Sequence, residues 1–357
     1  MRSVDFVVPG DPDTPTGGYL YDARILRGLD ALGWSVRRHS LAADFPWPSA
    51  ASLDAAATTL GALPDGRAVV VDGLALAGLV PVLRASGRAL RLVALVHHPV
   101  ADETGLSDGL RERTSRAERA AYALVERIVV TSRWTARRLE RDGVPAERIR
   151  VAEPGTDRPA AAAHAAPGDR APARLLCVAT LTERKGHALL LDALARVKDL
   201  RWHLDCVGSL DRDPATAAAV RGRIAALGLG ERVSLHGEVS RAALDALYAR
   251  ASGFVLASHL EGYGMALAEA LAHGLPVVAT AGGAIPDTVG DAALLVPAGD
   301  VGALADALER ALTDAALRRR LAAAARVRAS ALPTWTEASA RFAAAIEDLA
   351  AGGHGPA

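Results

Sequence analysis

The sequence predicts an α/β protein made of two doubly wound domains, and three observations lead to that prediction. The chain has 357 residues, which is too long for one ordinary core and suits two domains of roughly 150–180 residues each. Short apolar runs alternate with longer helix-patterned segments, as expected for a parallel sheet covered by helices on both faces. This alternation pauses around residues 149–157 and restarts near residue 175, which indicates two similar halves.

In the first half, the strands are predicted where short apolar runs occur. These runs cover residues 4–8, 35–38, 68–71, 92–96 and 128–130. A loop rich in Pro, Asp and Gly follows the first run, and a helix is expected over about residues 19–32. Residues 158–174 are rich in Ala, Pro and Gly and show little periodicity, so we expect a linker there.

The second half repeats the pattern of strand and helix. Strands are predicted at residues 175–178, 203–207, 233–236, 254–257, 277–279 and 294–296, with helices at 186–197, 216–227 and 264–272. Residues 301–349 are mostly helical and are interrupted at Pro333. Two doubly wound halves would place a ligand cleft between the carboxyl ends of both sheets.

Composition excludes several partners. The formal net charge is zero and the sequence pI is about 7.2, so no long-range field attracts nucleic acid or a membrane surface. The first nine residues do not resemble a signal peptide and no window reaches 18 apolar residues, which predicts a soluble protein without a membrane span. Cys177 and Cys206 lie in apolar runs without metal-ligand spacing, so we expect buried thiols and a cytoplasmic location.

The segment from Ser258 to Thr280 has the clearest functional pattern, because it follows a buried strand and opens a helix. Gly262 and Gly264 carry no Cβ, so the backbone there can turn tightly and approach a ligand closely. The amides of Tyr263, Gly264 and Met265 would lack intrahelical partners. A helix N-terminus of this kind is an anion site and suits a diphosphate.

Two carboxylates flank this turn, Glu261 before the helix and Glu269 about two turns later. A carboxylate close to a phosphate would repel it, so these groups should face hydroxyls. We expect sugar hydroxyls at Glu261 and ribose hydroxyls at Glu269. The alternative is an ordinary strand–loop–helix whose acids are solvated at the surface.

As a whole, the segment resembles the Glu-x7-Glu signature of the retaining nucleotide-sugar glycosyltransferases of family 4. These enzymes have the GT-B fold, in which two Rossmann-like doubly wound domains face a central cleft. Gly17-Gly18 resembles the family's N-terminal glycine loop, which approaches the diphosphate. Residues 129–132 and 151–157 resemble the strands that close the N-terminal domain.

The resemblance also implies a division of labour between two domains. Residues 1–155 would form the acceptor-side domain, completed by a C-terminal helix at about 336–350 that crosses back to it. Residues 156–335 would form the domain that binds the nucleotide-sugar donor.

A departing nucleoside diphosphate gains negative charge, and fixed cations stabilise that charge in the transition state. Lys185-Gly186 matches the family's Lys-Gly, but Thr180 stands where family members commonly have an arginine. We hypothesise that Arg184 supplies the second cation, with Thr180 giving a hydroxyl; the alternative is that Arg184 is a solvated loop charge. Val239 lies in a loop, residues 236–239, on which selectivity for base and sugar would depend.

His97-His98 ends a predicted strand at the edge where the cleft should lie. His97 aligns best with a histidine that family members often carry, so we favour it over His98 as a contact to sugar or acceptor, although either could cap or pack. Asp102 and Glu103 would contact acceptor hydroxyls or be plain loop acids.

Two tyrosines close to the glycine loop are further candidates for the acceptor site. Tyr19 and Tyr21 follow Gly17-Gly18 directly. We expect them, with residues 102–105, to help set which acceptor binds.

Asp11-Pro12-Asp13 and Asp211-Arg212-Asp213 spell the Asp-x-Asp pattern of metal-dependent transferases. Such short matches arise easily in acidic loops, and the resemblance points to the metal-independent GT-B class. We therefore predict no metal and no cofactor beyond the nucleotide-sugar co-substrate.

The predicted activity is retaining transfer of a hexose from a nucleotide-diphosphate sugar to a hydroxyl of a small-molecule, glycan or lipid-linked acceptor. A nucleotide-sugar epimerase or phosphorylase on the same fold, or a non-catalytic nucleotide-sugar binding protein, are the alternatives. A dinucleotide-dependent oxidoreductase fits less well, because no Gly-x-Gly-x-x-Gly follows the first strand.

Overall fold

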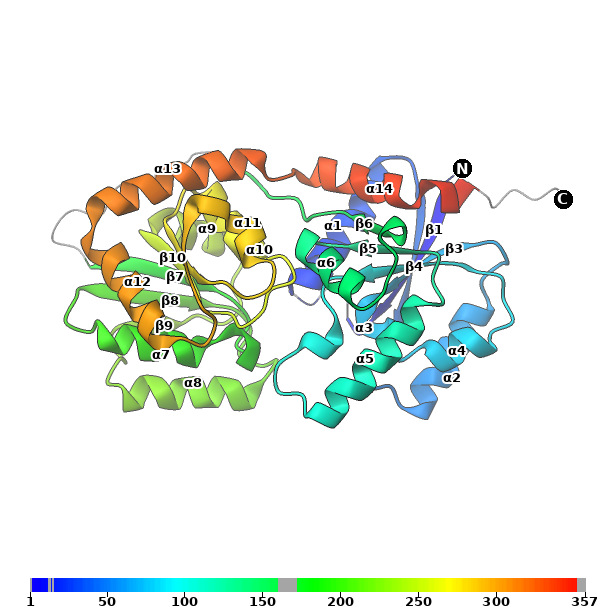
Figure 1. Ribbon diagram of the computed structural model, residues 1–357, viewed down its shortest axis with the longest axis horizontal. Coiled ribbons are helices and arrows are strands. Elements are labelled where there is room, and N and C mark those ends of the chain that lie inside the picture. The colour runs from blue at the N-terminus through cyan, green and yellow to red at the C-terminus, as the bar shows by residue number, and fades with distance from the viewer. Residues whose placement is uncertain (1, 12–13, 15, 160–171, 352–357) are drawn as a thin grey trace. The chain divides into compact units, whose positions relative to one another are not determined.

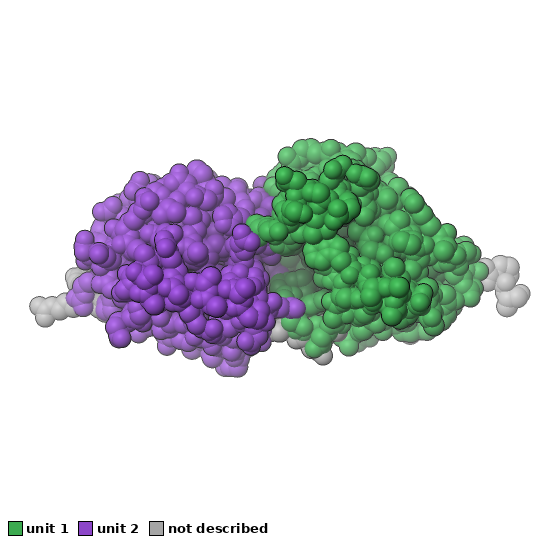
Figure 2. Space-filling view, turned by 90° about the horizontal axis from the view of Figure 1, so that it is seen from below, with its two compact units in different colours: residues 1–155, 333–357 green, residues 156–332 purple. Residues whose placement is uncertain are grey.

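The computed structural model describes residues 2–11, 14, 16–159 and 172–351 of the chain (Figure 1). Contacts divide the chain into two compact units: unit 1 comprises Met1–Gly155 with Pro333–Ala357, and unit 2 comprises Thr156–Leu332 (Figure 2). Most of the predicted linker and the residues Pro12 and Asp13 of the first Asp-x-Asp pattern lie outside the described residues.

Unit 1 is built on a parallel sheet. Within its described residues the sheet has six strands in the order β2-β1-β3-β4-β5-β6: β1 (Ser3–Pro9), β2 (Ser35–Leu41), β3 (Ala68–Asp72), β4 (Arg91–Val96), β5 (Arg127–Val130) and β6 (Ile149–Val151). The central strands β3, β4 and β5 are almost wholly buried. Runs of Val, Leu and Ala there have no polar alternation, as expected for strands covered on both faces.

Helices cover this sheet and follow its strands along the chain. They are α1 (Gly17–Ala31), α2 (Ala50–Gly61), α3 (Gly73–Leu76), α4 (Val80–Ala85), α5 (Asp108–Tyr122), α6 (Arg133–Arg141) and α14 (Trp335–Ala351), with 3₁₀ turns η1 (Val100–Asp102) and η2 (Ala146–Arg148). Side-chain caps begin several of them. Thr16 caps α1, and Asp72 caps α3 by accepting a hydrogen bond from the Leu74 amide.

The C-terminal helix α14 packs against α1 within unit 1 (Figure 1). A Cβ on Gly28 of α1 would overlap the side chain of Ser339, so glycine allows the two helices to approach closely. Phe342 is fully buried and stacks on Phe6 of β1 with ring centroids 5.7 Å apart. This helix therefore completes the core of unit 1 from the far end of the chain.

Unit 2 repeats the architecture with a second parallel sheet. Its described strands run in the order β12-β11-β10-β7-β8-β9, with β7 (Ala173–Val178), β8 (Trp202–Val207), β9 (Val233–Leu235), β10 (Gly253–Leu256), β11 (Val277–Thr280) and β12 (Ala293–Val296). Cys177 and Cys206 face each other in register on β7 and β8 as free, buried thiols. The prediction of buried thiols is confirmed.

The helices of unit 2 also alternate with its strands. They are α7 (His187–Arg196), α8 (Pro214–Ala226), α9 (Arg241–Arg250), α10 (Met265–Ala272), α11 (Ile285–Val289), α12 (Val301–Thr313) and α13 (Ala315–Ala331), with 3₁₀ turns η3 (Glu183–Lys185) and η4 (Gly290–Ala292). None of the helices in the described part of the chain combines the length and hydropathy that a membrane crossing requires.

The predicted fold class, two doubly wound α/β halves, is confirmed. The apolar runs do not predict β6, because Ile149–Val151 is short and Arg150 interrupts its run. The family resemblance placed this closing strand at residues 151–157, of which only Val151 lies in a strand. Strand β2 continues to Leu41, beyond the predicted end at residue 38, since edge strands tolerate the polar residues that His39 and Ser40 introduce.

Candidate functional site

Each sheet has one place where the strand order reverses, and ligands of doubly wound folds bind there, beyond the carboxyl ends of the strands. In unit 1 the reversal lies between β1 and β3, and in unit 2 between β7 and β10. Most predicted site residues of unit 2 follow β7 and β10, whereas Val239 follows β9; Gly17, Gly18 and His97 of unit 1 follow β1 and β4. Topology thus gives each unit its own candidate site, described separately below.

The glycine turn after β10 has the geometry that the sequence predicts. Gly264 adopts a left-handed backbone with φ of 90° and forms the N-cap of α10, where no side chain provides a capping hydrogen bond. A side chain at that φ would be strained. The first amides of α10, beginning at Met265, therefore have no intrahelical acceptor and create positive potential at the turn.

Glycines at two positions let neighbouring loops of unit 2 pack directly on one another. A Cβ on Gly186 would overlap the carbonyl of Ala257 at the end of β10, and one on Gly283 would overlap the backbone of Glu261. Glu261 also bridges to Gly283, and its carbonyl accepts the Ala284 amide at 2.8 Å. The loops after β7, β10 and β11 consequently hold the Glu261 backbone in one place.

Glu261 lies at the centre of a charged group that we call the Glu261 cluster: Glu261, Arg184, Lys185 and Ser258. Its Oε1 accepts hydrogen bonds from Lys185 Nζ and Ser258 Oγ, both at 2.6 Å. Arg184 Nη1 lies 3.7 Å from Oε2 and donates to the Leu260 carbonyl at 2.7 Å. Arg184 and Lys185 therefore both face the Glu261 carboxylate, whereas Thr180 lies half-buried just after β7.

This cluster has one more positive charge than negative. Burial alone would raise the pKa of Glu261, but the charges of Lys185 and Arg184 outweigh burial and lower that pKa below its ordinary value. Glu261 is 6% exposed and stays ionised at neutral pH. The cluster can therefore attract an anion while Glu261 offers a carboxylate to hydroxyl groups.

Glu269, the second carboxylate of the signature, lies on α10 and is paired. Its Oε1 accepts a hydrogen bond from Arg241 at 2.9 Å, and Arg241 also pairs with Asp245 at 2.9 Å. Val239, just before α9, is partly buried and packs against the core of unit 2. Arg241 thus places a cation next to the carboxylate that was predicted to hold ribose.

In unit 1, His97 lies between two buried carboxylates, and we call these three residues the His97 cluster. His97 Nε2 lies 3.3 Å from Asp22 Oδ1 and 3.6 Å from Asp72 Oδ2. Asp22 comes from α1, Asp72 ends β3, and His97 follows β4. Gly18 lies against the ring, because a Cβ there would be 3.3 Å from His97 Cδ2.

The two carboxylates control the charge of this histidine. Burial by itself lowers the pKa of His97, but the negative charges of Asp22 and Asp72 outweigh burial and raise that pKa to about 10. Burial raises the pKa of Asp22 to about 7, although His97 opposes the rise. The three facing atoms lie within 4.8 Å of one another, close enough to share one cation.

Several predicted acceptor residues are engaged within the protein. Tyr21 was wrongly placed at the acceptor site, because its ring is fully buried and its hydroxyl donates to the Ala152 carbonyl at 2.9 Å. Tyr19 donates to the Pro9 carbonyl at 2.7 Å and stays half-buried. His98 pairs with Glu103 at 2.7 Å, and Asp102 pairs with Arg138 at 3.0 Å.

Two family models match nearly the whole chain between them. The model described as "Glycosyltransferase Family 4" matches residues 3–158, and the model described as "Glycosyl transferases group 1" matches residues 165–328. The chain belongs to the family 4 glycosyltransferases.

A curated relative agrees with this assignment. The glycosyltransferase is 29% identical over 322 residues to "MMP alpha-(1->4)-mannosyltransferase" of Mycolicibacterium hassiacum, an alignment that covers 85% of this chain and 76% of the relative.

Solved structures share the fold. Sucrose-phosphate synthase from Thermosynechococcus elongatus superimposes with a TM-score of 0.81 at 23% identity, covering 98% of this chain and all of the other. HepE of Anabaena in complex with UDP and glucose gives a TM-score of 0.77 at 18% identity, covering 98% of this chain and all of the other. The GT-B fold that the sequence predicts is therefore confirmed.

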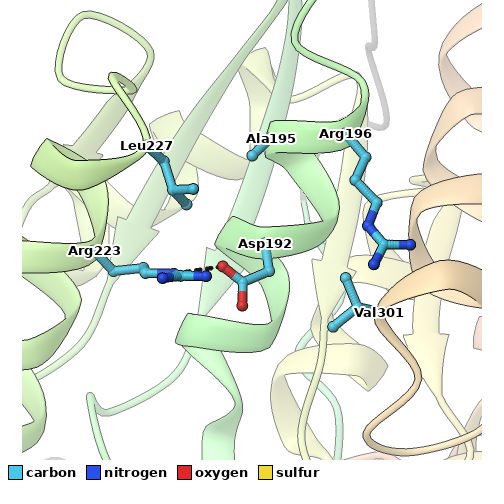
Figure 3. Close-up of a pocket in the computed structure, with 6 residues that line it drawn as sticks. All are labelled: Asp192, Ala195, Arg196, Arg223, Leu227 and Val301. Atoms are coloured by element: carbon cyan, nitrogen blue, oxygen red, sulfur yellow. Dashed lines mark hydrogen bonds and ion pairs between the residues drawn. The ribbon is translucent and has the colours of Figure 1, made fainter.

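A shallow depression on the glycosyltransferase lies away from these strand ends. It is formed by side chains of α7, α8 and α12 and the turn after α8, among which Asp192 and Arg223 pair at 2.6 Å (Figure 3). Because it lies in the helical layer and not at the strand-order reversal, we do not assign it to the donor.

Sequence reasoning missed four residues of the two clusters and their surroundings: Ser258, Arg241, Asp22 and Asp72. Two of them left a signal in the sequence. Asp22 falls on the buried face of α1 with Ile25 and Leu29, at a position where an apolar residue is usual. Asp72 ends the apolar run of β3, whereas Ser258 and Arg241 pair with acids only through the fold.

Proposed function

We propose that this glycosyltransferase moves a hexose from a nucleotide-diphosphate sugar to a hydroxyl acceptor, with retention of anomeric configuration and without a metal. The observation that carries the proposal is the meeting of Arg184 and Lys185 with the uncapped start of α10 at the strand-order reversal of unit 2. Two cations and unpaired amides at one place suit a diphosphate. Relatives and fold neighbours named for mannosyl transfer and for UDP with glucose support a nucleotide sugar as donor.

In the proposed donor complex, the diphosphate binds at Gly262, Tyr263, Gly264 and Met265. Glu261 accepts hydrogen bonds from sugar hydroxyls, and Glu269 accepts them from the ribose after Arg241 shifts toward the nucleotide. Free, buried cysteines are consistent with the reducing cytoplasm that we propose as the setting.

The proposed chemistry is a front-face displacement. The acceptor oxygen forms a bond to the anomeric carbon while the bond from that carbon to the phosphate oxygen breaks, and the acceptor proton passes to the departing phosphate. Arg184 and Lys185 stabilise the charge that develops on the leaving group. Glu261 is not used as a nucleophile in this proposal, because Oε1 accepts hydrogen bonds from Lys185 and Ser258 and Oε2 faces Arg184 at 3.7 Å.

The donor can be identified by thermal shift with UDP, GDP, ADP and TDP, followed by their sugars, because a ligand of the folded state raises the melting temperature. We expect one base to stabilise the protein at micromolar concentration, with EDTA present. Transfer to candidate acceptors is then followed by NMR of the anomeric proton, with retention expected. Inversion, a trapped glycosyl-enzyme, or activity that EDTA abolishes and magnesium restores would each contradict part of the proposal.

The same assays separate the rival activities on this fold. An epimerase converts the donor with no acceptor present, and a phosphorylase needs free phosphate. We expect neither behaviour, and product that forms only when an acceptor is added would support transfer.

A further inference from the structure

The burial of Asp22 is not explained by any hydrogen bond among the described residues. Asp22 is 1% exposed, and neither carboxylate oxygen has a hydrogen-bond donor there. A carboxylate removed from water without a partner is strongly destabilising. The charge of His97, 3.3 Å from Oδ1, is the compensation that the structure offers.

Asp72 faces the same ring but has a second role. Its Oδ1 accepts the Leu74 amide at 2.6 Å at the start of α3, which fixes the carboxylate. That leaves Oδ2, 3.6 Å from His97 Nε2. Two acids from two different elements therefore converge on one nitrogen.

Three neutral residues also contact His97 and restrict it further. The Tyr21 ring packs edge-on against the imidazole with centroids 5.5 Å apart. Thr131 and Thr135 donate hydrogen bonds to the His97 carbonyl at 3.1 and 3.2 Å. Since Gly18 leaves room for the ring, the side chain is held with Nε2 facing the two carboxylates.

We propose that Asp22 and Asp72 are positioning residues that keep His97 protonated, with Nε2 directed at the two carboxylates. The ring then meets the substrate as a fixed cation and not as a general base. This inference rests on the proposed function for its catalytic meaning. A histidine that stays protonated cannot accept the proton of the acceptor hydroxyl. That proton must then go to the departing phosphate, as in the front-face displacement described above.

Histidine NMR on the intact protein tests the charge without any assay of transfer. Protein labelled with ¹³C at histidine Cε1 is titrated from pH 5.5 to 9.5, and the His97 signal is assigned by its loss in His97→Gln. We expect the wild-type ring to stay protonated beyond pH 8.5. In Asp22→Asn and Asp72→Asn it should titrate at least one pH unit lower, because each variant removes one facing charge. A wild-type ring that titrates near or below pH 6.5 would overturn the inference.

Kinetics of the same variants test whether Asp22 acts through His97. We expect Asp22→Asn to lower kcat about ten-fold or more with little change in KM for the donor, in line with the contribution of a single positioned charge. In the His97→Gln background the same substitution should have no further effect. Independent, multiplicative losses would show that Asp22 is merely structural.

Manganese provides a third readout. If Mn²⁺ at micromolar concentration broadened the His97 signal, the carboxylates would hold a metal and the inference would be wrong; an unchanged spectrum supports it. The wild-type titration remains informative even if a variant does not fold. A protonated His97 in a protein without transferase activity would contradict the proposed function and leave the charge assignment intact.

Discussion

The His97 cluster of unit 1 and the Glu261 cluster of unit 2 have opposite charge balance. His97 is one base between two acids, Asp22 and Asp72, whereas Glu261 is one acid facing two cations, Arg184 and Lys185. Each cluster lies at the carboxyl ends of strands, where the strand order reverses. The same topology thus forms an anion-attracting site in unit 2 and an acid-rich site in unit 1. The two sites differ in charge because they carry different side chains.

The composition of the chain makes this contrast more informative. Lysine occurs only at positions 185 and 198, among 41 basic residues. Lys185 is used where a compact cation must reach a carboxylate oxygen, 2.6 Å away in a mostly buried site. Lys198 is exposed on the same unit, so a substitution there serves as a control for one at Lys185.

The largest effect is expected from Lys185→Ala, which removes one of the two cations of the Glu261 cluster. Turnover should fall by about 10²- to 10³-fold, by analogy with deleting a preorganised donor to a developing charge. The fall in turnover is measured by steady-state kinetics, with the donor that thermal shift identifies. Lys198→Ala should leave turnover unchanged, and near-normal activity in Lys185→Ala would remove the basis for the donor site.

A smaller effect is expected from Glu269→Gln, which keeps the shape but weakens the acceptor offered to ribose. The donor Kd should rise by roughly 10- to 100-fold, since hydrogen bonds to a charged group contribute about 1.5–3 kcal/mol. Isothermal titration calorimetry measures the change, with Glu309→Gln on α12 as an exposed control. An unchanged Kd would mean that Glu269 serves only to hold Arg241.

Two buried glutamates, one in each unit, contribute to stability with opposite pH dependence. In unit 1, Glu118 accepts the amides of Val100 and Ala101, and burial raises its pKa to about 7 although those hydrogen bonds oppose the rise. Because the pKa of Glu118 is higher in the folded state than in the unfolded state, its contribution to stability is fully present below pH 4.5, the ordinary pKa of the group. This contribution is lost as the pH rises through 7. In unit 2, Glu261 has a lowered pKa, so its contribution is lost only as pH falls below 4.5.

Glu118→Gln tests the unit 1 part of this prediction. Urea unfolding between pH 5 and 8 should show that the wild type loses up to about 3 kcal/mol from Glu118 over this range. The variant should lose less, because its amide does not titrate. Glu112→Gln on the same helix, with an exposed side chain, is the matched control. Identical pH profiles for wild type and Glu118→Gln would refute the assignment.

The smallest effect is expected from Gly18→Ala. The added Cβ would lie 3.3 Å from His97 Cδ2, so the ring must move by a few tenths of an ångström. We expect turnover to fall a few-fold while the melting temperature is unchanged or slightly higher, because alanine favours a helix over glycine by up to about 1 kcal/mol. Gly109→Ala in α5, where the nearest side-chain atom is 3.8 Å away, should leave turnover unchanged and affect the melting temperature as little as Gly18→Ala does.

Fold and site differ in how far they could be predicted. Apolar runs identified eleven of the twelve described strands, because each buried strand leaves a local pattern, and Ile149–Val151 was missed where Arg150 breaks it. The turn at Gly264 could also be predicted from neighbouring residues alone, since a left-handed backbone favours glycine. Pairs such as Asp22 with His97 join residues 75 positions apart, and no local pattern encodes them. The acceptor role predicted for Tyr21 was wrong for the same reason, because its hydrogen-bond partner Ala152 lies 131 positions away.

The packing of α14 on α1 bears on the order in which the protein is made. All contacts internal to unit 2 come from one continuous stretch, Thr156–Leu332, which can fold as soon as it has left the ribosome. Unit 1 emerges first but must wait for Phe342 and its neighbours before its core closes. During synthesis the face of α1 that packs on α14 therefore stays uncovered until the last helix of unit 1 has been made.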